Sequence, residues 1–155
     1  MPFITDIDHW KIFYVIMWLY LVIAGGKRGR IVAFLALLLV LCTDQLSSTF
    51  IKHLIERARP CNVLPNVNLL VPCTGSFSFP SSHAVNNFGG AVFLSHFYPR
   101  LKYAFFTGAF LMAISRVFCG VHYPFDVLGG MIIGSIVGWV FITLWKGINK
   151  KLKIL

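Results

Sequence analysis

The feature that most constrains the fold is a succession of long apolar runs separated by short, often basic, links. A helix needs roughly 20 apolar residues to cross a bilayer, and its backbone polar groups must be satisfied within the helix. The pattern predicts an all-α integral membrane bundle of about five transmembrane helices, in a single domain over residues 1–155. The five runs extend over residues 10–24, 31–55, 84–98, 101–118 and 127–145.

Composition separates this chain from soluble proteins. Hydrophobic residues make up 57% of the chain and charged residues only 12%, whereas a soluble domain carries about 25% charged residues. A strongly basic chain often binds nucleic acid, and the net charge here is +9. In this sequence, however, the basic residues gather at the ends of apolar runs. We therefore expect the membrane bilayer as a partner and no nucleic acid. The sequence leaves the oligomeric state open.

The basic links predict the orientation in the membrane. Nine of the fourteen Lys and Arg residues lie in residues 27–30, 100–102 and 146–153, which an up-and-down bundle places at one end. Segments rich in Lys and Arg stay on the cytoplasmic side of a membrane. We expect these links and the C-terminus in the cytoplasm, and the opposite end in the periplasm, as in a bacterial inner membrane.

Three stretches at the expected periplasmic end do not fit a plain apolar bundle. The first is "KHLIERARP", in which Lys52 and Arg59 are seven residues apart and would share one face of a continuous helix that ends near Pro60. Cationic side chains near a helix end commonly extend to water, so this stretch alone also fits an interfacial helix end. Glu56 and Arg57 are expected to pair with other groups at the rim, in structural rather than catalytic roles.

The second stretch, "SFPSSHAVNNF", predicts the start of a helix. Pro80 fits at or just before the first turn, and Ser81 and Ser82 suit the N-cap region. The free N–H groups of a helix N-terminus form an anion site, and His83 would lie beside a bound anion. An ordinary capped helix with an interfacial histidine is the alternative.

The third stretch, "SRVFCGVHYPFD", joins the fourth and fifth runs. Ser115 and Arg116 end the fourth run, and Pro124 suits the first turn of the fifth helix, with His122 just before it and Asp126 just inside. Asp126 can then accept a hydrogen bond from His122, which fixes the tautomer and activates the other ring nitrogen. A pair that merely caps the loop is the alternative.

Together the three stretches suggest phosphoryl transfer. Cations and helix N–H donors stabilise phosphate oxygens, while one oriented and one separate histidine can divide the roles of nucleophile and general acid. The carboxylates are too few and too scattered for a two-metal site, so we expect no metal and no cofactor. A small transporter or a catalytically silent phospholipid-binding protein is the alternative of another class.

The three stretches resemble the signature of the type 2 phosphatidic acid phosphatase superfamily, K-x6-RP, P-S-G-H and S-R-x5-H-x3-D. The match spans residues 52–126, about half of the chain, and departs from the pattern at Ser82, where Gly is usual. The expected five spans are one fewer than in many membrane members of this family. The residues that match are Lys52, Arg59, Pro60, Pro80, Ser81, His83, Ser115, Arg116, His122 and Asp126.

The resemblance implies a role for each of these side chains. His122 would attack phosphorus, Asp126 would orient it, and His83 would protonate the leaving group and then activate water. The backbone N–H of Ser82 would help to bind phosphate, and its small side chain is expected to leave activity intact. The residues expected to bind phosphate are Lys52, Arg59, Ser81, Ser82 and Arg116.

A site at the outer membrane surface suits a lipid with a phosphate or diphosphate head group. Lipid A at its 1-phosphate and undecaprenyl diphosphate are the favoured substrates, with phosphatidylglycerophosphate and phosphatidate as alternatives. Cys61 and Cys73 bracket a polar loop on the same side and can form a disulfide if the compartment is oxidising. Two cysteines alone leave free thiols open as the alternative.

Overall fold

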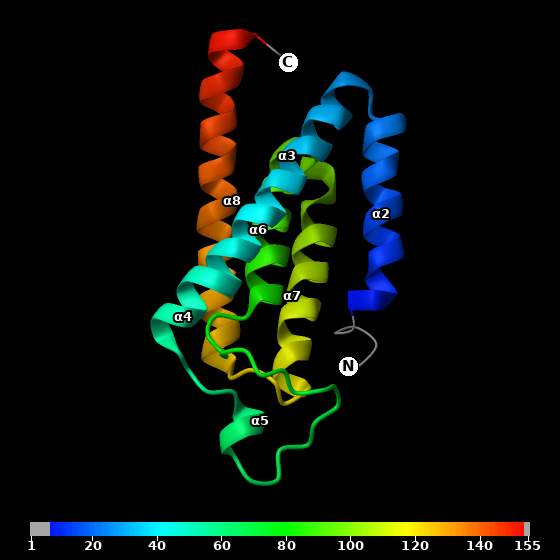
Figure 1. The fold of residues 1–155 in the computed structure, drawn as a ribbon. Helices are drawn as coiled ribbons and strands as arrows, with labels where there is room; N and C mark the ends of the chain where they lie inside the picture. The colour runs from blue at the N-terminus through cyan, green and yellow to red at the C-terminus, as the bar shows by residue number, and fades with distance from the viewer. Residues whose placement is uncertain (1–6, 154–155) are drawn as a thin grey trace.

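A computed structural model describes the backbone of residues 7–153 and the side chains of residues 10–153. Within these residues every regular element is a helix, as the apolar pattern predicts, and the long helices lie side by side in one bundle (Figure 1). The helices are α2 (Ile7–Ile23), α3 (Gly26–Asp44), the π-helix η1 (Gln45–Ile51), α4 (Lys52–Ile55), α5 (Pro60–Val63), α6 (Ser82–Phe97), the 3-10 helix η2 (Pro99–Leu101), α7 (Lys102–Phe118) and α8 (Pro124–Leu152).

Helix α6 is the central element and packs against α3, α7 and α8. Its contact with α8 is very close because Gly130, Gly134 and Gly138 recur every four residues along one side of α8. A Cβ atom on Gly134 would lie 2.2 Å from the carbonyl oxygen of Val85, and one on Gly138 would lie 2.6 Å from that of Gly89. Small residues at this spacing let two helix backbones touch, as in membrane helix pairs.

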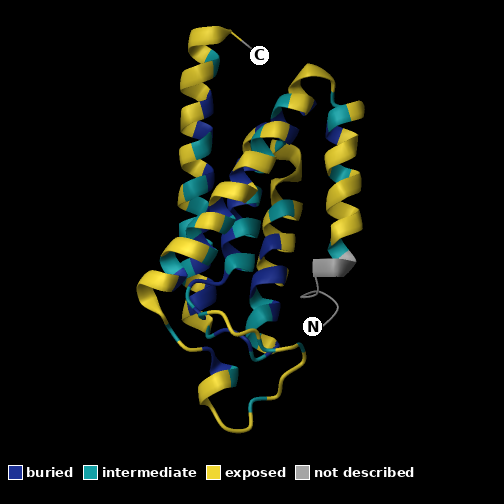
Figure 2. Ribbon diagram, viewed as in Figure 1, coloured by how far each residue is buried: buried dark blue, intermediate teal, exposed yellow. Residues whose placement is uncertain are grey.

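The outer surface of the bundle is apolar. Figure 2 shows buried residues toward the interior and exposed ones around the outside, and the exposed set includes Phe34, Ile132 and Trp139, each more than half accessible. Large apolar side chains on all outward faces suit lipid rather than water. By length and composition, the helices able to cross a membrane are Gly26–Val63, Pro99–Phe118 and Pro124–Leu152.

The remaining two expected spans are shorter. The apolar part of α2 covers Trp10–Ile23, and α6 has sixteen residues with polar side chains in its first half. At 1.5 Å per residue, α6 is shorter than the roughly 30 Å hydrocarbon core. Its neighbours surround it, so it depends less on lipid contact than the outer helices do. The count of five spans stays a prediction.

The second apolar run forms one continuous helical stretch from α3 through η1 to α4. The hydroxyls of Thr43 and Ser47 donate to the carbonyls of Leu39 and Asp44, at 2.9 and 3.3 Å. Such bonds compete with regular helix bonding. The π-helical segment begins directly after Asp44, between these two hydroxyls.

The expected shared helix face of Lys52 and Arg59 is wrong. The helix ends at Glu56, which adopts a left-handed conformation with φ of 49°. Arg59 is extended, with φ of −74° and ψ of 152°, because a proline restricts the residue before it. Pro60 therefore does not end a helix but begins the short α5. The two cations come together through a chain reversal instead of through helical periodicity.

The two ends of the bundle differ in chemistry. At one end the basic links meet, since Arg28 Nη2 donates to the carbonyl of Phe97 at 2.5 Å and its guanidinium lies over the ring of Tyr98. The last turns of α8 lie at the same end (Figure 1). At the other end lie α4, α5, the start of α6 and the start of α8, which carry the unusual stretches. Which side of a membrane each end faces stays a prediction.

The close contact of α6 with α8 predicts that Gly134→Ala destabilises the protein. The added methyl cannot fit against the Val85 carbonyl unless the helices move apart, and overpacking of this kind costs about 1–3 kcal/mol. The matched control is Gly147→Ala in the same helix, where a Cβ meets nothing within 4 Å. Thermal unfolding in detergent should give a lower Tm for Gly134→Ala and an equal or higher Tm for Gly147→Ala. Equal Tm values for Gly134→Ala and wild type would contradict the packing described.

Candidate active site

The side chains singled out by the three stretches come together at one end of the bundle. Each is supplied by a different segment, and their charges interact: His83 lies within electrostatic range of Lys52, Arg59, Arg116 and His122. The contributing segments are α4 for Lys52, the turn before α5 for Arg59, the start of α6 for Ser81, Ser82 and His83, the end of α7 for Ser115 and Arg116, the α7–α8 loop for His122 and the first turn of α8 for Asp126.

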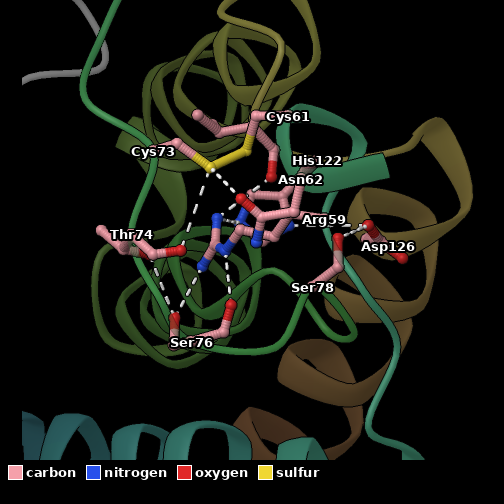
Figure 3. Close-up of a disulfide and its surroundings, with 10 residues drawn as sticks. Arg59, Cys61, Asn62, Cys73, Thr74, Ser76, Ser78, His122 and Asp126 are labelled. Carbon is pink, nitrogen blue, oxygen red and sulfur yellow. Dashed lines mark hydrogen bonds and ion pairs between the residues drawn. A yellow bond between two sulfur atoms is a disulfide. The ribbon is translucent and has the colours of Figure 1, made fainter. Parts of the chain in front are cut away.

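Arg59 is a buried cation whose hydrogen-bond partners are all neutral. Its Nε and Nη2 donate to the carbonyl and the hydroxyl of Ser76, at 2.7 and 2.9 Å. Its Nη1 donates to the carbonyl of Val121 at 3.0 Å and reaches the Nε2 of His122 at 3.2 Å (Figure 3). The side chains described include no carboxylate within ion-pair distance of Arg59 or of Lys52.

Burial of these two cations is close to complete. Lys52 is 6% exposed and Arg59 is 4% exposed, and the nearby charge of Arg116 has the same sign. A buried charge without a partner of opposite sign is costly. An anion that enters this end of the bundle would compensate that cost, which favours an anion-binding role over ordinary snorkelling at a helix end.

His122 presents one ring nitrogen to Arg59 and the other to Asp126. A guanidinium has only donors, so Nε2 must accept, and the proton of the neutral ring lies on Nδ1. Burial lowers the pKa of His122 to about 4, against the opposing effect of Asp126 and with the help of the charges of Arg59 and Arg116. The ring is therefore neutral near pH 7, and its Nε2 lone pair is directed at the guanidinium of Arg59.

The expected hydrogen bond between His122 and Asp126 is replaced by a longer contact. Nδ1 lies 3.6 Å from Oδ2, which exceeds hydrogen-bond distance. The fully buried carboxylate instead accepts from Arg57 Nη1 at 2.7 Å through Oδ1, and from the Ser78 hydroxyl and the Tyr123 N–H through Oδ2. The carboxylate of Asp126 still faces the Nδ1 of His122, as an orienting group would, although the two atoms are too far apart for a hydrogen bond.

Two of these partners were missed as functional residues by the sequence analysis. Arg57 was expected to pair at the rim, and it pairs with the carboxylate of the third stretch. Ser78 had no expected role. Their only sequence signal is proximity to the motifs, since Arg57 lies two residues before Arg59 and Ser78 two residues before Pro80.

The N-terminus of α6 has the form that the second stretch predicts. Ser81 is the N-cap residue, its side chain makes no capping bond, and its backbone N–H donates to the carbonyl of Asp126 at 3.0 Å. Its buried hydroxyl has no hydrogen-bond partner among the described residues. The hydroxyl of Ser82 instead lies 3.1 Å from that of Ser48, which donates to Asp44 at 3.3 Å. The side chain that replaces the usual glycine is therefore bonded to a neighbouring helix.

A disulfide closes the loop beside the site. Cys61 and Cys73 are joined, and the bond lies next to Arg59 and the segment that carries Ser76 (Figure 3). The hydroxyl of Thr74 lies 3.1 Å from that of Ser76. Since Ser76 accepts hydrogen bonds from Arg59, the chain after Cys73 is linked to Arg59 through this residue. Within the described part of the chain, no group of three His, Cys, Asp or Glu side chains is arranged to hold a metal ion.

Comparison with known proteins places these observations in a family. The family model described as "PAP2 superfamily" matches residues 33–150. A lipid A 4'-phosphatase of Bacteroides thetaiotaomicron is 34% identical over 117 residues, covering 71% of this chain and 52% of that protein. Phosphatidylglycerophosphatase B of Bacillus subtilis is 36% identical over 132 residues, covering 77% of this chain and 59% of that protein. The chain thus spans about half the length of the curated relatives that it matches.

A solved structure has the same fold. The crystal structure of a transmembrane PAP2-type phosphatidylglycerolphosphate phosphatase from Bacillus subtilis superposes with a TM-score of 0.65 at 31% identity, covering 92% of this chain and 71% of that one. A likeness of this extent supports the membrane bundle described above. The family model, which matches well over half of the residues and includes all three stretches, leads to one conclusion: this chain belongs to the PAP2 superfamily.

Proposed function

We propose that this chain is a lipid phosphatase that hydrolyses a phosphate monoester or diphosphate of a membrane lipid head group, without a metal ion or cofactor. The observation that carries the proposal is the environment of Arg59, a buried cation with neutral partners only, in contact with the Nε2 of His122. A phosphate drawn to Arg59 would supply the missing negative charge. It would also arrive next to an unprotonated ring nitrogen.

In the first step, the lone pair of His122 Nε2 attacks phosphorus. Burial and the surrounding cations lower the pKa of His83, so His83 takes up its proton only together with the phosphate, whose negative charge offsets those cations. A nitrogen–phosphorus bond forms as the bond between phosphorus and the leaving oxygen breaks, and the protonated His83 donates its proton to that oxygen. Lys52, Arg59 and Arg116 bind the other phosphate oxygens and stabilise the charge that spreads over them. The product of this step is a phosphohistidine on His122 and a free lipid alcohol or lipid monophosphate.

In the second step, water replaces the histidine. His83 takes a proton from the water as its oxygen attacks phosphorus, and the nitrogen–phosphorus bond breaks with its electron pair returning to Nε2. Inorganic phosphate leaves. Asp126 faces the Nδ1–H of the ring, where its negative charge stabilises the positive ring of the intermediate. Ser81 and the N–H groups at the start of α6 add donors for the departing anion.

We further propose that the substrate head group belongs to a lipid of the bacterial envelope. Lipid A phosphates and undecaprenyl diphosphate are the favoured substrates, with phosphatidylglycerophosphate and phosphatidate as alternatives. The two relatives named above, a lipid A 4'-phosphatase and a phosphatidylglycerophosphatase, support a lipid phosphate as the substrate. We place the protein in the inner membrane as a single domain of five spans, with the site toward the periplasm and the C-terminus in the cytoplasm.

A phosphate-release assay on the purified protein tests the proposal. In detergent with EDTA present, wild type should release phosphate from at least one of four lipids: lipid A, undecaprenyl diphosphate, phosphatidylglycerophosphate and phosphatidate. The rate of phosphate release should fall at least about a thousandfold in His122→Ala, because this variant lacks the nucleophile and cannot form the intermediate. Vanadate, which mimics pentacoordinate phosphorus, should inhibit wild type.

The outcomes of this assay separate the function from its mechanism. No release from any of the four lipids would contradict the phosphatase proposal and favour a binding or transport role. Release that His122→Ala does not reduce would leave a phosphatase with another nucleophile. Asn68→Ala, an exposed loop substitution, is the control that should leave the rate unchanged.

The tautomer and pKa of His122 give a second prediction. Since burial lowers the pKa to about 4, the ring should stay neutral from pH 7 down to about pH 5. Nitrogen NMR of protein labelled at histidine, with His122→Ala used to assign the signal, should give a proton on Nδ1 and a bare Nε2 throughout this range. Titration near the ordinary value of about 6.5, or a proton on Nε2, would refute the arrangement.

Labelling of single cysteines tests the orientation. With Cys42 and Cys119 replaced by serine, a membrane-impermeant maleimide added from the periplasm should reach Asn66→Cys and not Lys27→Cys. Both positions are exposed, one in the loop beside the site and the other in the basic first turn of α3. The reverse pattern would place the site in the cytoplasm and exclude an envelope lipid in the outer leaflet.

A further inference from the structure

The Asp126 carboxylate is held by two side chains, those of Arg57 and Ser78, that are not among the defined positions of the three motifs. We propose that Arg57 and Ser78 are positioning residues of the reaction: they fix the carboxylate that faces His122, and so fix the nucleophile. The inference rests on the proposed function, because it assumes that His122 attacks phosphorus. Neither residue touches the phosphate in this account, and each acts through Asp126.

Arg57 supplies the charge that a buried carboxylate needs. Its Nη1 lies 2.7 Å from Asp126 Oδ1, and the carboxylate side chain is 0% exposed while that of Arg57 is 36% exposed. The guanidinium also lies over the ring of Tyr123, 4.1 Å from its centre. A cation stacked on an aromatic ring loses freedom to turn away. The Tyr123 backbone N–H donates to the other carboxylate oxygen at 2.8 Å, so one residue supports both partners.

Ser78 holds the second carboxylate oxygen from the opposite end of the loop. Its buried hydroxyl donates to Asp126 Oδ2, as Figure 3 shows. Its backbone N–H donates to the carbonyl of Arg57 at 2.7 Å. The two residues are therefore linked to each other, and the loop between them is closed a second time by the Cys61–Cys73 disulfide. The carboxylate is held by a small, doubly closed unit rather than by a free loop.

This arrangement has two consequences for His122. The donors to both oxygens stop the carboxylate from rotating, so Oδ2 stays 3.6 Å from Nδ1 and the ring plane is defined. The positive charge of Arg57 also offsets the negative charge of Asp126 and limits how strongly Asp126 favours a protonated ring. The other charged or titratable groups that face the ring are Arg59 before α5, Arg116 at the end of α7 and His83 on α6. Without Arg57, the carboxylate would favour a protonated His122 more strongly.

The kinetic test compares Arg57→Gln and Ser78→Ala with wild type on whichever lipid is hydrolysed. A misplaced reacting group costs on the order of a hundredfold, so we expect kcat to fall by roughly 10–100-fold while KM changes by less than about threefold. Arg57→Lys and Ser78→Thr keep the charge and the hydroxyl and should recover much of the loss. Arg100→Gln, an exposed arginine at the opposite end, and Ser135→Ala, whose hydroxyl bonds within its own helix, are the matched controls.

The second measurement separates positioning from a merely structural role. Nitrogen NMR should give a higher pKa for His122 in Arg57→Gln than in wild type, and a value close to wild type in Arg57→Lys. If Arg57 contributed packing alone, Arg57→Gln would lower Tm and kcat but would not raise the pKa of His122, and Arg57→Lys would have no such shift to restore. Unchanged kcat, or a lowered kcat with an unmoved pKa of His122, overturns the inference.

The outcomes also separate this inference from the proposed function. If wild type releases no phosphate, the phosphatase proposal fails and this inference, as a statement about catalysis, fails with it. If wild type is active and both variants keep full kcat, only the inference fails. Should Arg57→Gln not fold, Ser78→Ala and Ser78→Thr carry the kinetic test, because the hydroxyl is small and its removal leaves the ion pair in place.

Discussion

The contact between α6 and α8 is the constraint on which the rest of the structure depends. The second motif lies at the start of α6, Asp126 of the third motif lies in the first turn of α8, and the glycines of α8 let the helix backbones touch. A bulkier interface would push the two helix starts apart. The hydrogen bond from the backbone of Ser81 to the carbonyl of Asp126 spans this junction at 3.0 Å. Two helix N-termini that are fixed to each other thus carry His83 and Asp126, and His122 lies in the loop that leads directly into α8.

The site itself concentrates positive charge and leaves it unbalanced. Lys52 and Arg59 are buried, Arg116 is near, and the Asp126 carboxylate that is close is occupied by Arg57, Ser78 and Tyr123. The buried cations therefore raise the electrostatic free energy of the folded state, and a bound anion would offset that increase. Burial, helped by the charges of Arg59 and Arg116, lowers the pKa of His122 and keeps the ring unprotonated. In the function proposed above, the cations that would attract phosphate therefore also help to keep the nucleophile unprotonated.

Much of this could be predicted from the sequence, because periodicity and composition act locally. Apolar runs predicted the helices, Pro80 and Pro124 predicted two helix starts, and the motif spacing pointed to the cluster. The chain reversal between Lys52 and Arg59 was not predicted, since it depends on a left-handed Glu56 that no local pattern marks. The pairing of Arg57 and Ser78 with Asp126 joins residues 69 and 48 positions apart, and such contacts follow only from the packed fold.

The bond between Arg59 and His122 has a consequence for the reactivity of the histidine. Before any ligand enters, the Nε2 lone pair is occupied by a guanidinium N–H, and the ring is almost wholly enclosed. An alkylating or oxidising reagent that reaches this end of the bundle would meet a hydrogen-bonded cation in place of a bare imidazole. A ligand with enough negative charge would draw Arg59 toward itself and uncover the lone pair. In the function proposed above, the histidine would thus be chemically shielded until the charge of a substrate releases its reactivity.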